Sequence, residues 1–425
     1  MKLLSFDSIC VATLLAVFAM PVRLVSQLSA TQDQKPNSTR SMRYTIEDLG
    51  IVGTNFFQPG QPFEISNNGW VSGGAGVGTD YGPPEQAVLW HKGSVINVGN
   101  PGRGGNSIAF GVNDRGLAVG EAEDTSSEVT TTEDFCGFEF MGYTSSPTPC
   151  VPFIWKGGKM VALKTLGGVN GVATWVNSYG AIAGYAENTT ADSTCPPGGP
   201  QIYQFKPVVW LGNWIQPLPT AGKKFNDPDG VALAVNDLGQ VVGSTGTCTS
   251  FNPNSLFNLQ PVHAVLWENG IAHDLGSLPN QSNYVAENIN NRGEVVGGPA
   301  IAGQAFLWTA ESGMQGLGTA EGDNYSIGIG INDKGEIVGI SANFSPEGAI
   351  NTIRGFVRQN GSLVDLNTLI VGDNPFPAGG LITNPFGDYP TGLLTACKIS
   401  SKGEITGIAV DQNGFTHAYV AIPTN

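Results

Sequence analysis

One pattern of apolar and polar positions recurs seven times along the chain. It consists of a β-branched residue, Asn, Asp or a small substitute, a variable residue and Gly, followed by a short apolar run that ends in a second Gly. Asn and Asp bond to their own backbone in turns and Gly accepts a positive φ, so each copy predicts a tight hairpin between strands of Val and Ile. The first glycines of the copies are Gly69, Gly116, Gly180, Gly239, Gly293, Gly335 and Gly403.

A second element follows each hairpin, an apolar run that ends in Trp in five of the copies. A third element, clearest at residues 271–276 and 363–366, completes the unit. Each unit is then a four-stranded antiparallel meander of roughly 40–65 residues, the size of one propeller blade. The aromatic residues repeat with the units, which favours packing between neighbouring blades; they are Trp90, Trp155, Trp210, Trp267 and Trp308.

The two ends of the chain complement each other. After residues 417–420 the chain stops at Asn425, so the seventh unit lacks its fourth strand. A strand of that fourth type, residues 44–50, stands alone before the first hairpin. An open solenoid caps its ends instead of sharing a unit between them. We therefore expect an all-β fold, a closed seven-bladed β-propeller of four-stranded antiparallel blades, with the last blade completed by the N-terminal strand.

The same motifs resemble the bacterial extracellular HAF-repeat family. Residues 263–267 (His-Ala-Val-Leu-Trp), followed by Asp-Leu-Gly at residues 274–276, are the closest copy of that repeat. The resemblance covers about residues 44–422, although Arg358 and Ala421 stand where the repeat has Trp. It implies an exported β-propeller and supplies no activity or catalytic residues.

The N-terminus has the order of an export signal. Lys2 precedes an apolar run at residues 9–22, and small residues lead from Ser26 to Ala30 before the chain turns polar. A spanning helix needs about 20 apolar residues, so cleavage is favoured over an uncleaved anchor. We expect a signal peptide at residues 1–30, a flexible linker at 31–43 and the propeller at 44–425. The mature protein would then be extracellular, periplasmic or at the cell surface, without a membrane span.

Composition and charge narrow the function classes. The chain has 59 Gly among 425 residues, only 13% charged residues and a formal net charge of -15. Long helices rich in Glu, Lys and Arg are therefore not expected. A nucleic-acid binder needs a basic face, so that class is excluded as well.

The long loops of the predicted propeller all fall on one face of the disc. In a four-stranded blade the 2–3 loops and the links between blades share a face, and loops on a rigid scaffold concentrate binding residues. The long segments are residues 74–85, 121–150, 185–206, 244–262, 340–353 and the link 371–393. Their aromatic rings could stack on sugars or anchor a protein, or could simply pin the loops to the disc. The ligand-binding candidates are Phe138, Tyr143, Phe376, Phe386 and Tyr389.

One of these loops is rich in carboxylates. Glu123, Asp124, Glu133 and Asp134 are candidate oxygen ligands for a structural Ca²⁺, although their spacing matches no defined calcium loop. The alternative is an acidic loop that faces water. We expect no other cofactor.

The cysteines fit an oxidising compartment. Cys136 and Cys150 bracket one loop, and Cys195 and Cys248 lie in loops of neighbouring blades, so each pair is a candidate disulfide. Cys397 falls in a first strand and is expected to be a free buried thiol. No C-x-x-C spacing points to zinc or redox chemistry.

Three functions remain open from the sequence. The favoured hypothesis is a monomeric binding protein that holds a carbohydrate or protein on the long-loop face without turnover. The alternative is a polysaccharide hydrolase or lyase that uses loop carboxylates as acid and base. A structural protein of the cell envelope is the third. The chain has only four His and no nucleophile elbow, zinc helix or phosphate loop, so no catalytic residue is assigned.

Overall fold

The computed structural model describes residues 41–50, 61–76, 85–99, 105–124, 149–195, 201–221, 225–248, 262–300, 302–345, 350–384 and 387–424. The signal peptide predicted at residues 1–30 and most of the linker lie outside these ranges, so both stay predictions. In the described part of the chain, no helix has the length and apolar character needed to cross a membrane.

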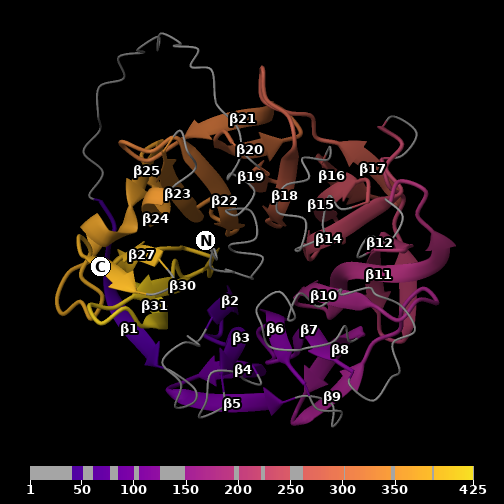
Figure 1. Cartoon of the computed structure of the whole chain (residues 1–425), viewed down its shortest axis with the longest axis horizontal. Helices are drawn as coiled ribbons and strands as arrows, with labels where there is room; N and C mark the ends of the chain where they lie inside the picture. The colour runs from indigo at the N-terminus through magenta and orange to yellow at the C-terminus, as the bar shows by residue number, and fades with distance from the viewer. Residues whose placement is uncertain are drawn as a thin grey trace.

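Seven sheets stand around a central axis like blades, and the chain visits them in order (Figure 1). Blade 1 contains β2 (Gln61–Ile65), β3 (Val71–Gly76), β4 (Glu85–His91) and β5 (Ser94–Gly99). Blade 2 contains β6 (Ser107–Val112), β7 (Ala118–Glu123), β8 (Cys150–Lys156) and β9 (Lys159–Ala162). Blade 3 contains β10 (Gly171–Val176), β11 (Ala181–Ala191), β12 (Tyr203–Leu211) and β13 (Trp214–Pro217).

The remaining blades follow the same antiparallel order. Blade 4 contains β14 (Asp229–Val235), β15 (Val241–Gly246), β16 (Val262–Glu268) and β17 (Ile271–Asp274). Blade 5 contains β18 (Tyr284–Ile289), β19 (Val295–Pro299), β20 (Ala305–Thr309) and β21 (Gly313–Gly318). Blade 6 contains β22 (Tyr325–Ile331), β23 (Ile337–Phe344), β24 (Ile350–Gln359) and β25 (Ser362–Asp365). The all-β propeller predicted from the repeats is confirmed.

Both ends of the chain build blade 7, as the sequence predicted. Its inner strand is split into β28 (Gly392–Leu393) and β29 (Lys398–Ile399), which pair with β30 (Ile405–Val410). The C-terminal strand β31 (Thr416–Thr424) pairs with β30 and with the N-terminal strand β1 (Arg43–Gly50). The β1–β31 ladder runs antiparallel from Arg43 opposite Thr424 to Gly50 opposite Ala418 and closes the ring.

Side chains from adjacent blades form the core. The third-strand tryptophans lie between blades, as expected from their repetition: Trp267 of blade 4 packs with Ala183 and Val209 of blade 3. The Trp267 Nε1–H also donates to Pro219 O (2.6 Å), and Trp210 donates in the same way to the preceding blade. Burial of a large ring at each joint therefore binds the blades to one another as well as filling the core.

Some strands are longer than the sequence predicted. β11 and β12 extend through much of the segment 185–206 that was expected to be a loop, with Glu187 opposite Phe205. The carboxylate of Glu187 accepts hydrogen bonds from the backbone N–H of Val169 (2.9 Å) and of Asn170 (3.3 Å), which anchors this extension to the start of β10. The long link between blades 6 and 7 also has structure: a short 3₁₀ helix η2 (Leu366–Leu369) and a hairpin of β26 (Leu381–Asn384) and β27 (Gly387–Pro390).

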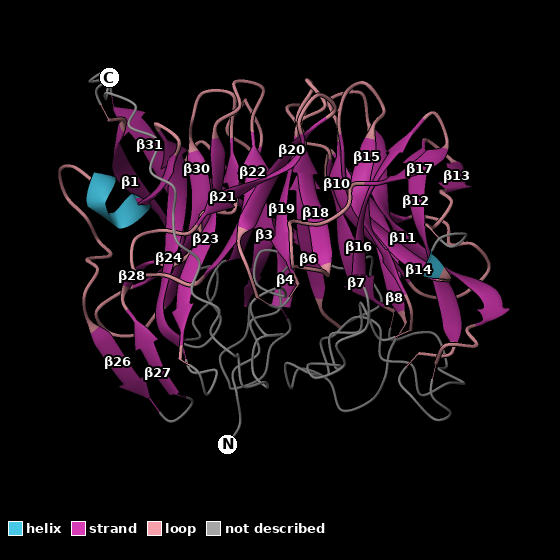
Figure 2. Cartoon of the chain, turned by 90° about the horizontal axis from the view of Figure 1, so that it is seen from above, coloured by secondary structure: helices cyan, strands magenta, loops and turns pink. Residues whose placement is uncertain are grey.

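The disc has two different faces (Figure 2). The hairpin face carries the turns between strands 1 and 2 and between strands 3 and 4. These turns are tight, and the first glycine of each repeat has a positive φ, from +68° at Gly116 to +92° at Gly180. The connection face carries the 2–3 connections, the links between blades and the β26–β27 hairpin, at the lower edge in Figure 2. The predicted gathering of long segments on one face follows from this topology.

An ion pair reinforces the ring closure, and it predicts a pH dependence of stability. His417 on β31 lies 3.2 Å from Asp48 on β1. The hydrogen bond with Asp48 raises the pKa of His417 above its usual 6.5, against the opposing effect of burial. Burial acts to raise the pKa of Asp48, but the bonds from His417 and from the Gly50 N–H outweigh it and hold that pKa below 3.8.

We expect His417→Gln to lower the free energy of unfolding by up to about 1 kcal/mol at pH 5.5 and to have almost no effect at pH 9. A raised histidine pKa stabilises the fold fully below the unfolded value near 6.5, and this contribution is lost as pH rises through the folded value. The Asp48 contribution is present above 3.8 and is lost as pH falls through its lowered pKa. Urea denaturation at the two pH values measures the difference, and an equal effect at both would contradict the ion pair.

Candidate functional site

The central channel of the propeller is closed by a layer of inner-strand side chains. Six first strands carry a register irregularity just before the hairpin motif, for example between Ala286 and Asn288 on β18. A bulge of this kind re-aims the extra side chain. The side chains around the remaining void of about 20 Å³ are Phe63, Phe110, Thr174, Trp175, Leu233, Glu287, Ile329, Cys397 and Lys398. This layer is the floor beneath any site at the centre of the hairpin face.

A ring of asparagine amides fixes the spacing of the blades at the hairpin face. Each of these asparagines uses Oδ1 to accept hydrogen bonds from its own turn; for Asn290 they come from the backbone N–H groups of Arg292 and Glu294, both at 3.0 Å. The Nδ2 group donates to the carbonyl of the equivalent residue in the next blade. The five links are Asn113 to Asn177, Asn177 to Asn236, Asn236 to Asn290, Asn290 to Asn332 and Asn332 to Ser400, at 2.9–3.0 Å. The sequence indicated only the turn role of these residues.

The two joints beside blade 1 are held differently, because Ser66 and Ser400 occupy the asparagine position and a hydroxyl lacks the reach of an amide. Asn67 bridges here: its Oδ1 accepts from the Ser401 N–H (2.7 Å) and its Nδ2 donates to Asp114 (3.4 Å). The Asn68 N–H donates to the other Asp114 oxygen (3.0 Å). The ring of turns is thus closed all the way around, which makes the mouth of the channel a preformed site.

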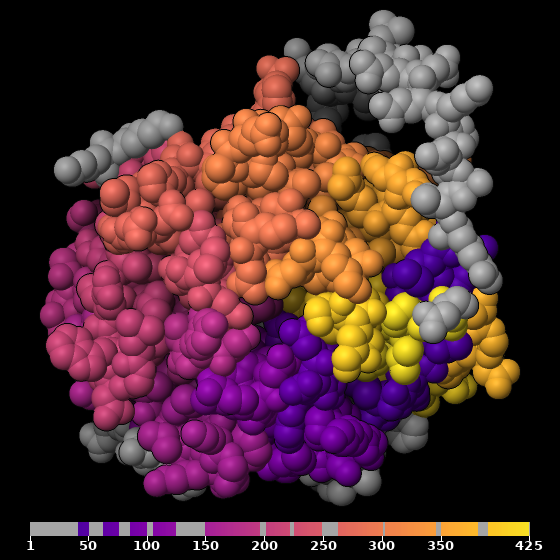
Figure 3. Space-filling model, turned by 180° about the vertical axis from the view of Figure 1, so that it is seen from behind, coloured from indigo at the N-terminus to yellow at the C-terminus, as the bar shows by residue number. Residues whose placement is uncertain are grey.

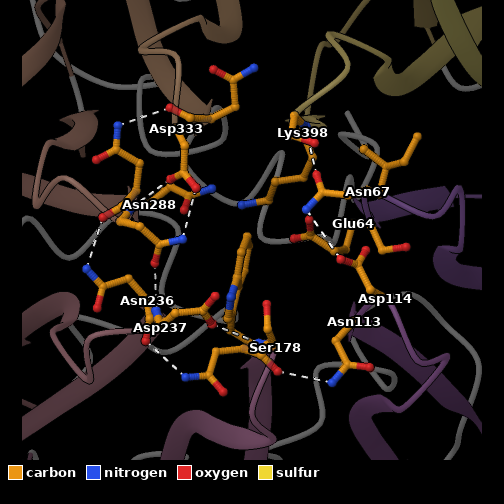
Figure 4. Close-up of a pocket in the computed structure, with 18 of the residues that line it drawn as sticks. Glu64, Asn67, Asn113, Asp114, Ser178, Asn236, Asp237, Asn288, Asp333 and Lys398 are labelled. Atoms are coloured by element: carbon orange, nitrogen blue, oxygen red, sulfur yellow. Dashed lines mark hydrogen bonds between the residues drawn. The ribbon is translucent and has the colours of Figure 1, made fainter.

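The mouth holds a cavity of about 140 Å³, which we call the central bowl (Figure 4). Figure 3 shows the hairpin face, where the blades meet around this opening. Its lining includes the residues of the hairpin motifs, whose first, β-branched side chains are packed in the cores between the blades: Ile65, Val112, Val176, Val235, Ile289, Ile331 and Ile399. Asp114, Asp237 and Asp333 stand at the rim, and Glu64, Trp175, Asn288 and Lys398 lie deepest.

Three blades contribute the charged groups at and beneath the floor of the bowl: Glu64 of blade 1, Glu287 of blade 5 and Lys398 of blade 7. The Lys398 ammonium of blade 7 donates to Ile329 O (3.2 Å) and lies 4.4 Å from the ring centroid of Trp175, a cation–π contact. Burial lowers the pKa of Lys398, and Glu64 and Glu287 oppose that effect. Burial raises the pKa of Glu64 to about 8 and that of Glu287 to about 7, although Lys398 counteracts both shifts.

Comparison with protein-family models finds no match, and comparison with curated proteins finds none either. The resemblance to HAF repeats therefore stays a prediction. Three solved structures with which the chain aligns are the β-propeller domain of the Trilobed protease from Pyrococcus furiosus, the acylaminoacyl peptidase of Pyrococcus horikoshii and a gluconolactonase from Xanthomonas campestris.

These likenesses are distant. The identities are 8%, 9% and 8%, and the TM-scores are 0.45, 0.39 and 0.32. The alignments cover 90%, 86% and 79% of this chain and 98%, 52% and 97% of the other chains, in the same order. Similarity at this level carries no activity from those proteins to this one, and the fold assignment depends on the strand topology itself.

The sequence-predicted aromatic candidates lie in different environments. Phe376 is 1% exposed and its ring centroid lies 5.0 Å from that of His417, so it belongs to the core near η2. That placement favours the loop-pinning role over ligand binding. Tyr389 belongs to β27 on the connection face. Phe138, Tyr143 and Phe386 lie outside the described residues.

The candidate calcium ligands are partly placed. Glu123 ends β7 and is 1% exposed; its Oε2 accepts hydrogen bonds from the backbone N–H (2.7 Å) and the side-chain amide (2.9 Å) of Asn106. Asp124 is also buried, and its N–H donates to Pro149 O (2.9 Å). These contacts favour a structural role for Glu123. Glu133 and Asp134 lie outside the described residues, so a Ca²⁺ site there stays a prediction.

A disulfide joins Cys195 to Cys248, with 4.9 Å between their Cα atoms, and so ties the 2–3 connections of blades 3 and 4 together as predicted. The two sulfurs and Asp192 lie close enough to ligate a metal, but a disulfide has no thiolate to offer. Cys150 is disulfide-bonded as well, and its predicted partner Cys136 lies outside the described residues. Cys397 is buried as expected, but it is disulfide-bonded, so the prediction of a free thiol was wrong.

The connection face carries a buried acidic pair beside this disulfide. Burial raises the pKa of Asp229 to about 8, and the neighbouring carboxyl of Asp192 adds to the shift. Asp229 accepts hydrogen bonds from Gln201 Nε2 (2.7 Å) and the Phe205 N–H (2.9 Å). A carboxylic acid that stays protonated near neutral pH can donate a proton, so this pair is a candidate for acid catalysis on the connection face.

The sequence analysis missed the deepest residues of the central bowl, which include Glu64, Trp175, Asn288 and Lys398. These residues occupy one position, the residue just before the β-branched residue of the hairpin motif. That position holds Glu64, Gly111, Trp175, Ala234, Asn288, Gly330 and Lys398 in the seven copies. The alternation of small residues with charged and aromatic ones in otherwise similar repeats is a signal that could have identified the site.

Proposed function

We propose that the protein is an exported binding protein that holds a carbohydrate or protein ligand on its connection face without chemical turnover. The observation that carries this proposal is the asymmetry of the disc: in the described part of the chain the turns of the hairpin face are tight, and the long connections between strands leave from the opposite face. Long segments on a rigid scaffold are the usual carriers of binding residues.

The scaffold beneath the connection face is suited to presenting such segments. The Cys195–Cys248 bond couples the connections of two blades, which limits the entropy lost when they engage a ligand. The β26–β27 hairpin projects from the same face next to the ring closure. Tyr389 on this hairpin, with Phe138 and Tyr143 on the longest connection, are the aromatic candidates we propose for ligand contact.

The test measures binding and product release together. Purified protein is incubated with a panel of polysaccharides, and both retention of the protein and release of sugar are assayed. We expect retention without product, and we expect it to be lost when residues 125–148 are replaced by a short Gly-Ser linker or residues 379–390 are removed. These boundaries leave Glu123, Phe376 and Leu393 in place, because each is buried in the scaffold. Undiminished binding by both variants would contradict the proposal.

A hydrolase or lyase is the second candidate, favoured by the raised pKa of Asp229. It predicts released sugar that disappears in Asp229→Asn while the fold is kept, as judged by circular dichroism. If the Asp229→Asn variant still releases sugar, another residue must carry out the catalysis. A protein that neither retains nor cleaves any polysaccharide would instead favour a protein partner or a structural role in the cell envelope.

A further inference from the structure

The central bowl lies on the hairpin face, so it is separate from the site proposed above. Its volume of about 140 Å³ corresponds to roughly ten water molecules at 10–15 Å³ for each enclosed water. The hydrogen-bonded ring of turns holds its mouth open at a fixed width. A cavity of this size and rigidity admits a small molecule and excludes a folded partner.

Glu64 has a backbone hydrogen bond from Ile65 but also one carboxyl oxygen that lacks a partner. The residue is 8% exposed, and its buried Oε2 has no hydrogen-bond partner. Figure 4 shows its carboxyl pointing into the cavity toward Lys398. A buried carboxyl oxygen without a donor is costly, because it has lost water and gained nothing in exchange. The position therefore favours a ligand that brings a hydrogen-bond donor.

The charges around the cavity favour a cationic donor. Four carboxyl groups line the bowl, Glu64 at its floor and Asp114, Asp237 and Asp333 at its rim, against the single ammonium of Lys398. Lys398 is already occupied by Ile329 O and the face of Trp175. A cleft lined by one sign of charge concentrates small ions of the opposite sign.

We propose that the central bowl binds a small aliphatic diamine or polyamine. One protonated amine donates to Glu64 at the floor, the alkyl spacer crosses the bowl, and a second ammonium faces the rim carboxylates. A primary ammonium has three donors and forms charge-assisted hydrogen bonds with a carboxylate. A neutral polyol of the same length carries no positive charge to pair with the carboxyl groups of the bowl, so weaker binding is expected.

Proton linkage supplies a signature specific to Glu64. Burial raises its pKa to about 8, with Asp114 adding to the shift and Lys398 opposing it. Glu287, which also interacts with Lys398, lies beneath the bowl. An ammonium beside Glu64 stabilises its charged form, so binding at pH 7 releases a proton and affinity rises with pH until Glu64 is fully ionised.

The experiment is calorimetric titration of the purified protein with 1,4-diaminobutane and with spermidine, at pH 6.5 and pH 8.5. The uncharged 1,4-butanediol is the ligand control. Repeating the titration in buffers of different ionisation enthalpy counts the protons released. Glu64→Gln removes the charge at the floor. Asp373→Asn removes one exposed charge from the link between blades 6 and 7, outside the bowl, and is the matched control variant.

We expect tighter binding at pH 8.5, proton release at pH 7, weaker binding of the diol, and a loss of about tenfold or more in affinity in Glu64→Gln only. If Glu64→Gln does not fold, proton release by the unaltered protein still decides the question. The proposal is overturned if the amines do not bind at millimolar concentration, if the diol binds equally well, or if the two variants behave alike. Polysaccharide retention is unaffected by any of these outcomes, so the two proposals fail separately.

Discussion

A chain that begins at residue 51 is expected to lose the cooperative fold, whereas one that begins at residue 41 is expected to keep it. The difference between them is the strand β1, which makes the only ladder on the outer side of β31 among the described strands. Without it, blade 7 ends in an unpaired edge, and an exposed edge strand invites aggregation.

The buried side chain of β1 explains the expected size of the effect. Tyr44 is 3% exposed and packs in one cluster with Leu366 and Tyr419. Its carbonyl also accepts a hydrogen bond from the Val371 N–H (2.8 Å), which fixes the link between blades 6 and 7. Loss of a buried aromatic side chain alone costs about 3–5 kcal/mol, a large part of the roughly 5–15 kcal/mol that stabilises a typical protein.

Circular dichroism with urea titration compares the two truncated chains. The expected outcome is a single sharp transition for the chain from residue 41 and a broad or absent transition for the chain from residue 51. Tyr44→Ala in the longer chain provides an intermediate case, with the ladder kept and the ring removed. Equal midpoints for all three chains would show that the closure contributes nothing to stability.

The fold could be predicted from the sequence because each level of the repeat points to the same structure. The Asn-Asp-x-Gly turns, the β-branched strands and the orphan strand at residues 44–50 agree on closed blades, and the structure confirms this arrangement. Local turn chemistry acts over four residues and is visible in a single copy. The ring closure could be predicted because it follows from counting strands and needs no side-chain geometry.

The central bowl could not be predicted in the same way. Glu64, Trp175 and Lys398 come from three different blades and meet only after the ring has closed. Their convergence depends on inner-strand irregularities such as the bulge near Glu64, which no residue pattern marked. The environment of the loop aromatics could not be predicted either. Phe376 is an aromatic residue in a long link, which is typical of a binding residue, but tertiary packing buries it beside η2.

The last glycine of each repeat was noted in the sequence without a physical reason, and the structure provides one for six of the seven copies. A Cβ added at these positions would lie 1.9–2.1 Å from a backbone carbonyl oxygen of the first strand, far inside contact distance. Where the inner strand has a bulge, the glycine lies opposite the inner-strand residue that comes just before the bulge. Gly243, for example, is opposite Ala232, and the register shift of the ladder follows immediately after Ala232. The positions are Gly120, Gly184, Gly243, Gly297, Gly339 and Gly407.

We expect Gly243→Ala to destabilise the protein by about 3 kcal/mol or more, because the added methyl group meets the carbonyl oxygen of Val231 and backbone cannot move aside as a side chain can. Gly239→Asn in the same hairpin is the matched control. Gly239 has a φ of +80° and open space around its Cβ direction, and Asn tolerates that conformation, so about 1 kcal/mol or less is expected. Urea denaturation of both variants measures the two values. If the two variants lose similar amounts of unfolding free energy, the Val231 carbonyl must move to make room for the methyl group. The recurring glycine would then need another explanation.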